Sequence, residues 1–195
     1  MPSDIVRTPY GPSVIRYVNT IDRPIEPVTE IIPEVKMIQN EEKPMKIPLK
    51  VFISYSHKDE DFKDELVTML TGLQRHGIIN AWQDRCIEEG NEWYKEIQDA
   101  MNDCDLAILL VSANFIASRF IQDEELPKLL KRRIESGLRV VPIIVKPCPW
   151  QSEPVIRDIQ VLPRDGKPII TFSKDNGDRD QVWTDIAKAI EKRAK

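Results

Sequence analysis

The stretch LAILLVSANFIASRFIQDEELPKLL, residues 106–130, decides the fold class of this chain. Its first six residues, 106–111, are all apolar, which indicates a strand buried on both faces, as in a parallel sheet. Serines, an aromatic residue and a carboxylate pair follow, and then a helical pattern resumes. Polar residues just beyond the carboxyl end of a buried strand lie where open α/β sheets bind their ligands. The stretch therefore predicts an α/β fold and also the position of its site.

Strands and helices alternate along the rest of the chain. Helical spacing of apolar residues predicts one helix between an Asp59 cap and a Gly77 stop, and three more around 93–101, up to 136 and at 178–192. We expect strands at 49–56, 78–82, 106–111, 139–145 and 169–172.

This alternation predicts a flavodoxin-like fold, a five-stranded parallel sheet with helices on both faces and the strand order 2-1-3-4-5. Pro142 lies inside the fourth strand, where a central position would lose a ladder hydrogen bond. In this order the loops after strands 1 and 3, residues 55–59 and 112–118, open into one crevice. The crevice is the expected ligand site.

Residues 1–48 differ in composition from the rest of the chain. They hold eight of the fifteen prolines and a single glycine, with short β-branched pieces that never settle into a long period. Proline removes a backbone donor and fixes φ, so this segment cannot form a continuous helix or a central strand. We expect a Pro-rich arm or linker at 1–48, or a segment that docks on the domain or on a neighbouring subunit, followed by one domain at 49–193.

Charge and hydropathy exclude two classes of partner. The formal net charge of −4 and the pI near 5.4 argue against direct nucleic-acid binding, which needs a basic face. No apolar run approaches the roughly 20 residues that a membrane span requires. We therefore expect a cytoplasmic protein that binds neither nucleic acid nor membrane.

Metal sites and the common nucleotide motifs have little support in this sequence. Its three cysteines lack metal-ligand spacing, and only two histidines are present, so no metal is expected. The sequence contains no GxGxxG or Walker A pattern, which rejects a Rossmann or P-loop reading of a nucleotide site.

Three segments together resemble the signature boxes of bacterial Toll/interleukin receptor (TIR) domains. They are VFISYSHKDEDF at 51–62, AWQDRCIEEGNEWYKEI at 81–97 and LAILLVSANFIASRFIQDEEL at 106–126. The segments occur in the order and spacing of that family, and the resemblance covers residues 49–193, about three quarters of the chain. It implies the same five-stranded parallel sheet that the periodicity predicts.

The resemblance also implies one of two functions. Some TIR domains are scaffolds that signal by self-association, and others cleave NAD+ between nicotinamide and ribose, some also cyclising the ADP-ribose. In the enzymes an essential glutamate begins the helix after the third strand and follows a serine and an aromatic residue. This pattern points to Ser118, Phe120 and Glu125. Glu124 is the alternative catalytic residue, and adjacent helical positions differ by about 100° in direction, so only one can face the crevice squarely.

Other residues near the crevice are expected to bind the substrate. Aromatic rings can form apolar walls or stacking surfaces for the flat nicotinamide, although Phe52 also fits the core and Phe120 a helix anchor. The hydroxyls of Ser54 and Ser112 can bond ribose or pyrophosphate, or instead cap a turn or a helix. The expected substrate-binding residues are Phe52, Ser54, Tyr55, Asp84, Ser112, Ser118 and Phe120.

The loop at 85–91 resembles the BB loop of the family, which contacts a neighbouring TIR domain and controls access to the pocket. The expected assembly residues are Arg85, Glu88, Gly90 and Trp93. We expect NAD as a substrate, no cofactor, and a homo-oligomer or filament of TIR domains as the active state. These expectations describe an NAD+ nucleosidase, or ADP-ribosyl cyclase-like hydrolase, of bacterial defence or virulence. The alternative is a non-enzymatic TIR scaffold.

Overall fold

Strand β3, Leu106–Val111, lies at the centre of the fold and is buried along its whole length. The computed structural model describes residues 47–82 and 91–194, with only the backbone of Trp82 and of residues 91–93. All described residues belong to one compact unit, Lys43–Lys195. The arm expected at 1–48 lies outside the described residues, apart from its last two.

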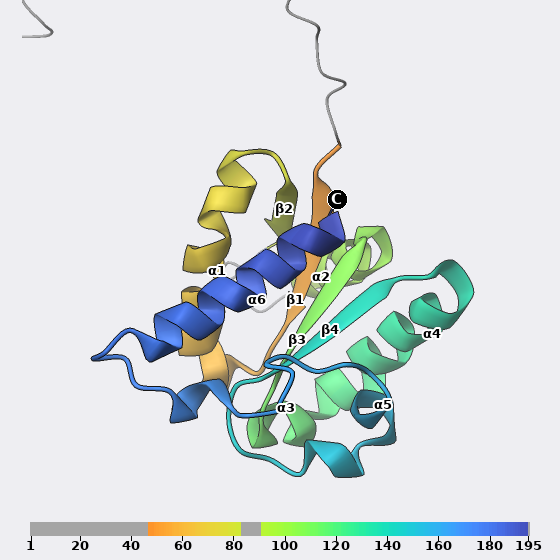
Figure 1. Ribbon diagram of the computed structural model, residues 1–195. Coiled ribbons are helices and arrows are strands. Elements are labelled where there is room, and N and C mark those ends of the chain that lie inside the picture. The colour runs from red at the N-terminus through yellow and green to blue at the C-terminus, as the bar shows by residue number, and fades with distance from the viewer. Residues whose placement is uncertain (1–46, 83–90, 195) are drawn as a thin grey trace, which may run out of the picture. The chain divides into compact units, whose positions relative to one another are not determined.

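The sheet is parallel, with the strand order β2-β1-β3-β4 (Figure 1). Its other strands are β1, Leu49–Ser54, β2, Ile79–Trp82, and β4, Arg139–Ile144. In register, Val51 pairs with Leu106, and Leu106 with Arg139. This part of the predicted strand order is confirmed, and it places the carboxyl ends of β1 and β3 side by side.

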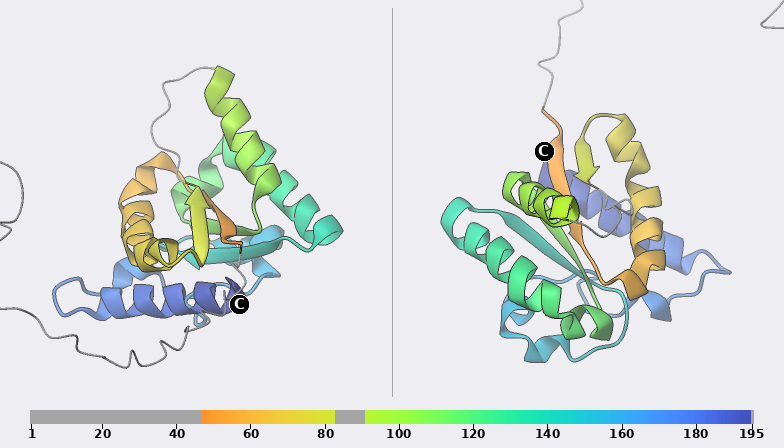
Figure 2. Two further views of the ribbon diagram at one scale, coloured as in Figure 1. Left: turned by 90° about the horizontal axis from the view of Figure 1, so that it is seen from above. Right: turned by 180° about the vertical axis from the view of Figure 1, so that it is seen from behind.

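Helices cover both faces of the sheet (Figure 2). One face packs on α1, Glu60–Arg75, and α6, Asp178–Ala194, and the other on α2, Asn91–Asp103, and α4, Leu126–Ser136. Successive side chains of a strand point to opposite faces, so each strand feeds both layers of core. Leu106, Ile108 and Leu110 of β3 pack with the α1 and α6 side, whereas Ala107, Leu109 and Val111 pack with the α2 and α4 side.

Short helical segments complete the described chain. They are η1, His57–Asp59, α3, Ala113–Ala117, η2, Ile121–Glu125, η3, Trp150–Ser152, α5, Pro154–Arg157, and η4, Ile169–Thr171. Helix α4 ends at Gly137, whose φ of 72° is a left-handed conformation that glycine adopts without strain. This confirms the helix stop expected there.

The fifth strand expected at 169–172 is wrong. Residues Ile169–Thr171 form the 3-10 turn η4, in which Thr171 N–H donates to Pro168 O at 3.0 Å and Phe172 N–H donates to Ile169 O at 3.1 Å. Ile170 N–H donates to Val145 O at 3.0 Å, just after β4, but this single bond does not extend into a ladder. Beyond β4 the described chain has only an isolated bridge between Ile143 and Leu162.

Pro142 occupies a place in β4 where its missing N–H does not interrupt the hydrogen-bond ladder with β3. The neighbouring Ile144 N–H points away from β3 and donates to Leu162 O at 2.9 Å, while Val145 N–H donates to Val111 O. Alternate residues of a strand direct their N–H groups to opposite sides, so the Pro142 nitrogen also faces away from β3. β4 is an edge strand of the described sheet, where proline is tolerated.

Candidate functional site

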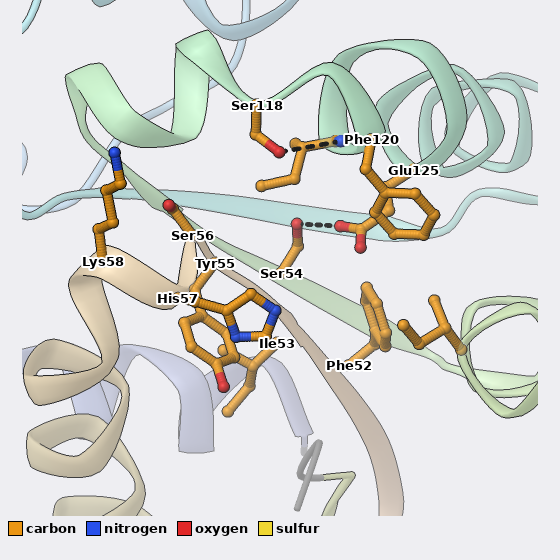
Figure 3. A pocket seen from close by; sticks show the side chains of 12 residues that line it. Phe52, Ile53, Ser54, Tyr55, Ser56, His57, Lys58, Ser118, Phe120 and Glu125 are labelled. Atoms are coloured by element: carbon orange, nitrogen blue, oxygen red, sulfur yellow. Dashed lines mark hydrogen bonds between the residues drawn. The ribbon is translucent and has the colours of Figure 1, made fainter. Parts of the chain in front are cut away.

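A pocket of about 340 Å³ lies at the carboxyl end of β1. Residues 52–58 line one side, and Ile97 of α2 reaches it from another element. Ser118, Phe120 and Glu125 line the opposite wall (Figure 3), and Ile121 also lines the pocket. The chain after β1 and the chain after β3 therefore meet at one pocket, as the predicted strand order requires.

Glu125 is the buried carboxylate of this pocket. The residue is 6% exposed, and its Oε2 accepts a hydrogen bond from Ser54 Oγ, which is itself buried (Figure 3). A carboxylate removed from water needs such donors, because an unpaired buried charge is costly. Ser54 is the last residue of β1, so the strand end fixes the position of the glutamate side chain.

A π-helical segment, η2, sets the direction of Glu125. Leu126 N–H donates to Ile121 O, which is the i→i+5 bond of a π turn. Pro127 follows directly, and in a regular α-helix a proline ring collides with the carbonyl four residues earlier. The wider π turn relieves this collision, and π turns occur frequently at functional sites.

Glu124 lies outside the pocket. Its side chain is partly exposed, and its Oε2 accepts a hydrogen bond at 3.1 Å from the hydroxyl of Tyr94 in α2. The hydrogen bond to Glu124 raises the pKa of Tyr94. The Tyr94 ring also meets Phe120 edge to face, with ring centroids 6.2 Å apart. Of the two adjacent glutamates, the structure places only Glu125 in the pocket.

The other predicted pocket residues contribute in different ways. Ser118 Oγ accepts from Ile121 N–H at 3.4 Å and so supports the start of η2, while the Phe120 ring stands beside Glu125 (Figure 3). Phe52 lines the pocket and is also core, at 2% exposed. Tyr55 lies at the opposite side and meets His57 edge to face at 5.9 Å.

Ser112 does not line the pocket. It is fully buried, its Oγ accepts from Phe115 N–H at 3.1 Å as the cap of α3, and its hydroxyl donates to Asp59. The helix capping expected as the alternative for Ser112 is therefore observed. Asp59 also accepts from Asn114 Nδ2 at 3.3 Å and from Lys146 Nζ at 2.6 Å.

Several predicted residues lie outside the described part of the chain. These are Asp84 among the expected substrate-binding residues and Arg85, Glu88 and Gly90 among the expected assembly residues. Trp93 belongs to α2, but its side chain also lies outside the described residues.

Three polar residues of the pocket wall were not among the predicted site residues. Ser56, His57 and Lys58 line it directly after β1. Their signal in the sequence is position alone, because the loop after the first strand of such a sheet opens into the crevice.

The described residues were also compared with the requirements of a metal site and of a membrane span. Within them, no group of three or more His, Cys, Asp or Glu side chains is placed to hold a metal ion. In the same part of the chain, no helix combines the length and apolar character needed to cross a membrane.

The parallel sheet, its flanking helices and the pocket at the end of β1 define a class of protein that the sequence comparisons identify. The profile of the TIR domain family matches residues 51–186. This chain belongs to the TIR domain family, and the resemblance seen in the sequence is confirmed.

Two similar proteins place the chain in context. The uncharacterized protein y4lF of Sinorhizobium fredii is 39% identical over 144 residues, which is 74% of this chain. The matched segment spans 43% of that relative, less than half of its length. Among solved structures, the TIR domains of the activated Roq1 resistosome recognising the effector XopQ are 22% identical, with a TM-score of 0.41 and coverage of 74% of this chain and 84% of that one.

Proposed function

We propose that this TIR domain cleaves NAD+ between nicotinamide and ribose. The observation that carries the proposal is the buried Glu125 carboxylate, hydrogen-bonded by Ser54 inside a pocket with the Phe120 ring beside it. A glutamate at this place is what the resemblance to the enzymatic TIR domains implies. No scaffold role requires a charged group at such a buried position.

The reaction makes few demands on the protein. The pyridinium of NAD+ is already positive, so the electron pair of the C1′–N1 bond passes to the ring nitrogen and nicotinamide leaves neutral. No general acid is needed for this leaving group, unlike an ordinary sugar leaving group. Positive charge develops at C1′, and the Glu125 carboxylate stabilises it and orients the ribose hydroxyls.

The product depends on the nucleophile that reaches C1′. Water adds to give ADP-ribose and releases one proton to solvent, whereas an adenine nitrogen adds to give a cyclic ADP-ribose. Phe120 beside Glu125 supplies an apolar surface against which a flat ring can pack. Hydrolysis needs a water molecule at C1′, whereas cyclisation requires the adenine to fold back to the same carbon.

We infer further that self-association of TIR domains switches the activity on, in bacterial defence or virulence. The family resemblance supports this inference. A TIR scaffold without enzymatic activity is the competing function, and nicotinamide release separates the two.

The test is nicotinamide release from NAD+ by concentrated, crowded protein. We expect Glu125→Gln to lower kcat by about 100-fold or more, the scale of losing one electrostatic stabiliser of a transition state. Glu124→Gln is the matched control, because it removes the adjacent carboxylate outside the pocket, and it should retain activity within about threefold.

Two results would contradict the proposal. Equal nicotinamide release by the wild type and Glu125→Gln would remove Glu125 from the reaction. Assembly of the protein with NAD+ left intact at every concentration would favour the scaffold.

A further inference from the structure

The pocket has a basic end that the cleavage chemistry leaves unused. His57 and Lys58 line it together with Ser56, and both side chains are exposed. In Figure 3 Lys58 stands at the opposite end from Glu125, with the His57 ring between them in that view. The pocket therefore carries a carboxylate at one end and nitrogen donors at the other.

Lys58 differs from the lysines around it. Lys63 pairs with Glu60 and Asp64, at 3.2 and 2.6 Å, and Lys146 pairs with Asp59 at 2.6 Å. Within residues 47–82 and 91–194, Lys58 forms no ion pair. Its charge is available to a ligand, whereas its neighbours are neutralised by carboxylates of the protein.

The turn η1, which carries these residues, is held in place by the buried carboxylate of Asp59. Asp59 N–H donates to Ser56 O at 2.7 Å and closes the turn, and the Asp59 side chain is fully buried. Its carboxylate accepts from Ser112 and Asn114 after β3 and from Lys146 after β4. Three side chains from two segments, one after β3 and one after β4, therefore hold η1 in place, and such support orients binding groups before a ligand arrives.

The geometry of a nucleotide matches this division of the pocket. Nicotinamide leaves from C1′ of its ribose, and the phosphate is attached through C5′ on the other side of the ring. A ribose with C1′ beside Glu125 directs its 5′-phosphate away from the carboxylate. The volume of about 340 Å³ is at the small end of the usual roughly 300–1,000 Å³ for ligand pockets, so it suits one nucleotide half with the remainder outside.

We propose that Lys58, His57 and the Ser56 hydroxyl form a subsite for the 5′-phosphate of a nicotinamide nucleotide, the pyrophosphate in the case of NAD+. This rests on the proposed function, because it takes C1′ to lie at Glu125. Charged nitrogen donors bind phosphate oxygens by charge-assisted hydrogen bonds, which are the stronger kind.

The experiment compares substrates that differ only in phosphate. Nicotinamide riboside lacks it, whereas nicotinamide mononucleotide and NAD+ carry it. For full-length Lys58→Ala we expect kcat/KM to fall about tenfold or more on both phosphorylated substrates, the scale of one hydrogen bond to a charged group, with a several-fold smaller loss on the riboside. Lys188→Ala, which removes one exposed lysine on α6, is the charge-matched control. It should leave kcat/KM unchanged on all three substrates.

If Lys58→Ala lost kcat/KM equally on the riboside and on NAD+, the subsite would be overturned. The same holds if kcat/KM did not fall on either phosphorylated substrate. Direct binding separates this from the cleavage proposal. By calorimetry, ADP-ribose should bind about tenfold more weakly to Lys58→Ala than to the wild type or to Glu125→Gln. This difference is expected even if no nicotinamide compound is cleaved, and its absence would contradict the subsite in that case too.

Discussion

Ser54 supplies a hydrogen bond to the Glu125 carboxylate, and its own role can be tested apart from that of the glutamate. Its Oγ donates to Glu125 Oε2, and both residues are buried. We expect Ser54→Ala to lower kcat on NAD+ by about tenfold, because a hydrogen bond to a charged group contributes roughly 1.5–3 kcal/mol. KM should change less, since the ribose still reaches the carboxylate.

Ser136→Ala provides the control for this prediction. Its hydroxyl donates to Arg132 O at 2.8 Å at the end of α4, and the residue does not line the pocket. The variant should keep the wild-type kcat. An unchanged kcat in Ser54→Ala, with a normal melting temperature, would show that the Ser54 bond does not act on the reaction.

At the residue scale, sequence reasoning located most of the pocket but not its limits. The position of Ser54, Phe120 and Glu125 followed from polar residues after buried strands and from the family pattern. The position of Ser112 outside the pocket could not be predicted in this way. It depends on a hydrogen bond to Asp59, 53 residues earlier in the chain. Pairings of this kind arise only when the loops after β1 and β3 meet.

Helices α1 and α6 are joined by one carboxylate, Glu65. Its Oε2 accepts from Trp183 Nε1 at 2.7 Å, and its Oε1 lies 2.6 Å from Lys174 Nζ and 3.2 Å from Arg179. Burial alone would raise the pKa of Glu65, but the hydrogen bonds from Lys174 and Trp183 and the charge of Arg179 outweigh it and lower the pKa.

A lowered pKa in the folded state means that ionised Glu65 stabilises the fold. This contribution is present above the ordinary value of 4.5 and is lost as the pH falls through the lowered pKa. We expect Glu65→Gln to reduce the free energy of unfolding by about 1 kcal/mol at neutral pH, as for partly exposed ion pairs, and to match the wild type in strong acid. Chemical denaturation across this pH range measures the difference.

The comparison for Glu65 is Asp185→Asn in α6. Asp185 pairs with Lys188 at 3.5 Å on an exposed surface, so its loss should be nearly neutral at every pH. A deficit in Glu65→Gln that stayed constant down to strong acid would show that packing, rather than charge, joins the two helices.

Regular elements could be predicted from sequence because their signal is periodic and local. The two elements that differed are turns, whose hydrogen bonds are not specified by an apolar pattern. Residues 169–172 are apolar and β-branched, as in a strand, yet their backbone bonds close the turn η4. The π segment Ile121–Glu125 has no apolar period of its own, and it leaves Glu125 buried and Glu124 partly exposed.

For the whole molecule, the proposal of activation by assembly makes a prediction that does not need the geometry of the assembly. Glu125 is 6% exposed, so Glu125→Gln leaves the outer surface, and hence the contacts between domains, almost unchanged. The inactive variant should therefore join assemblies as readily as the wild type. By mass action it should raise the fraction of wild-type domains that are assembled.

We accordingly expect nicotinamide release by dilute wild-type protein, too dilute to assemble alone, to rise several-fold per active domain when an excess of Glu125→Gln protein is added. The physical reason is that association depends on the total concentration of domains, whereas turnover depends only on those that retain the carboxylate. An equal mass of an unrelated acidic protein controls for crowding. Nicotinamide release per active domain could instead stay constant, both when the variant is added and when the wild-type concentration is raised. Cleavage would then be a property of the single domain, and assembly would not control it.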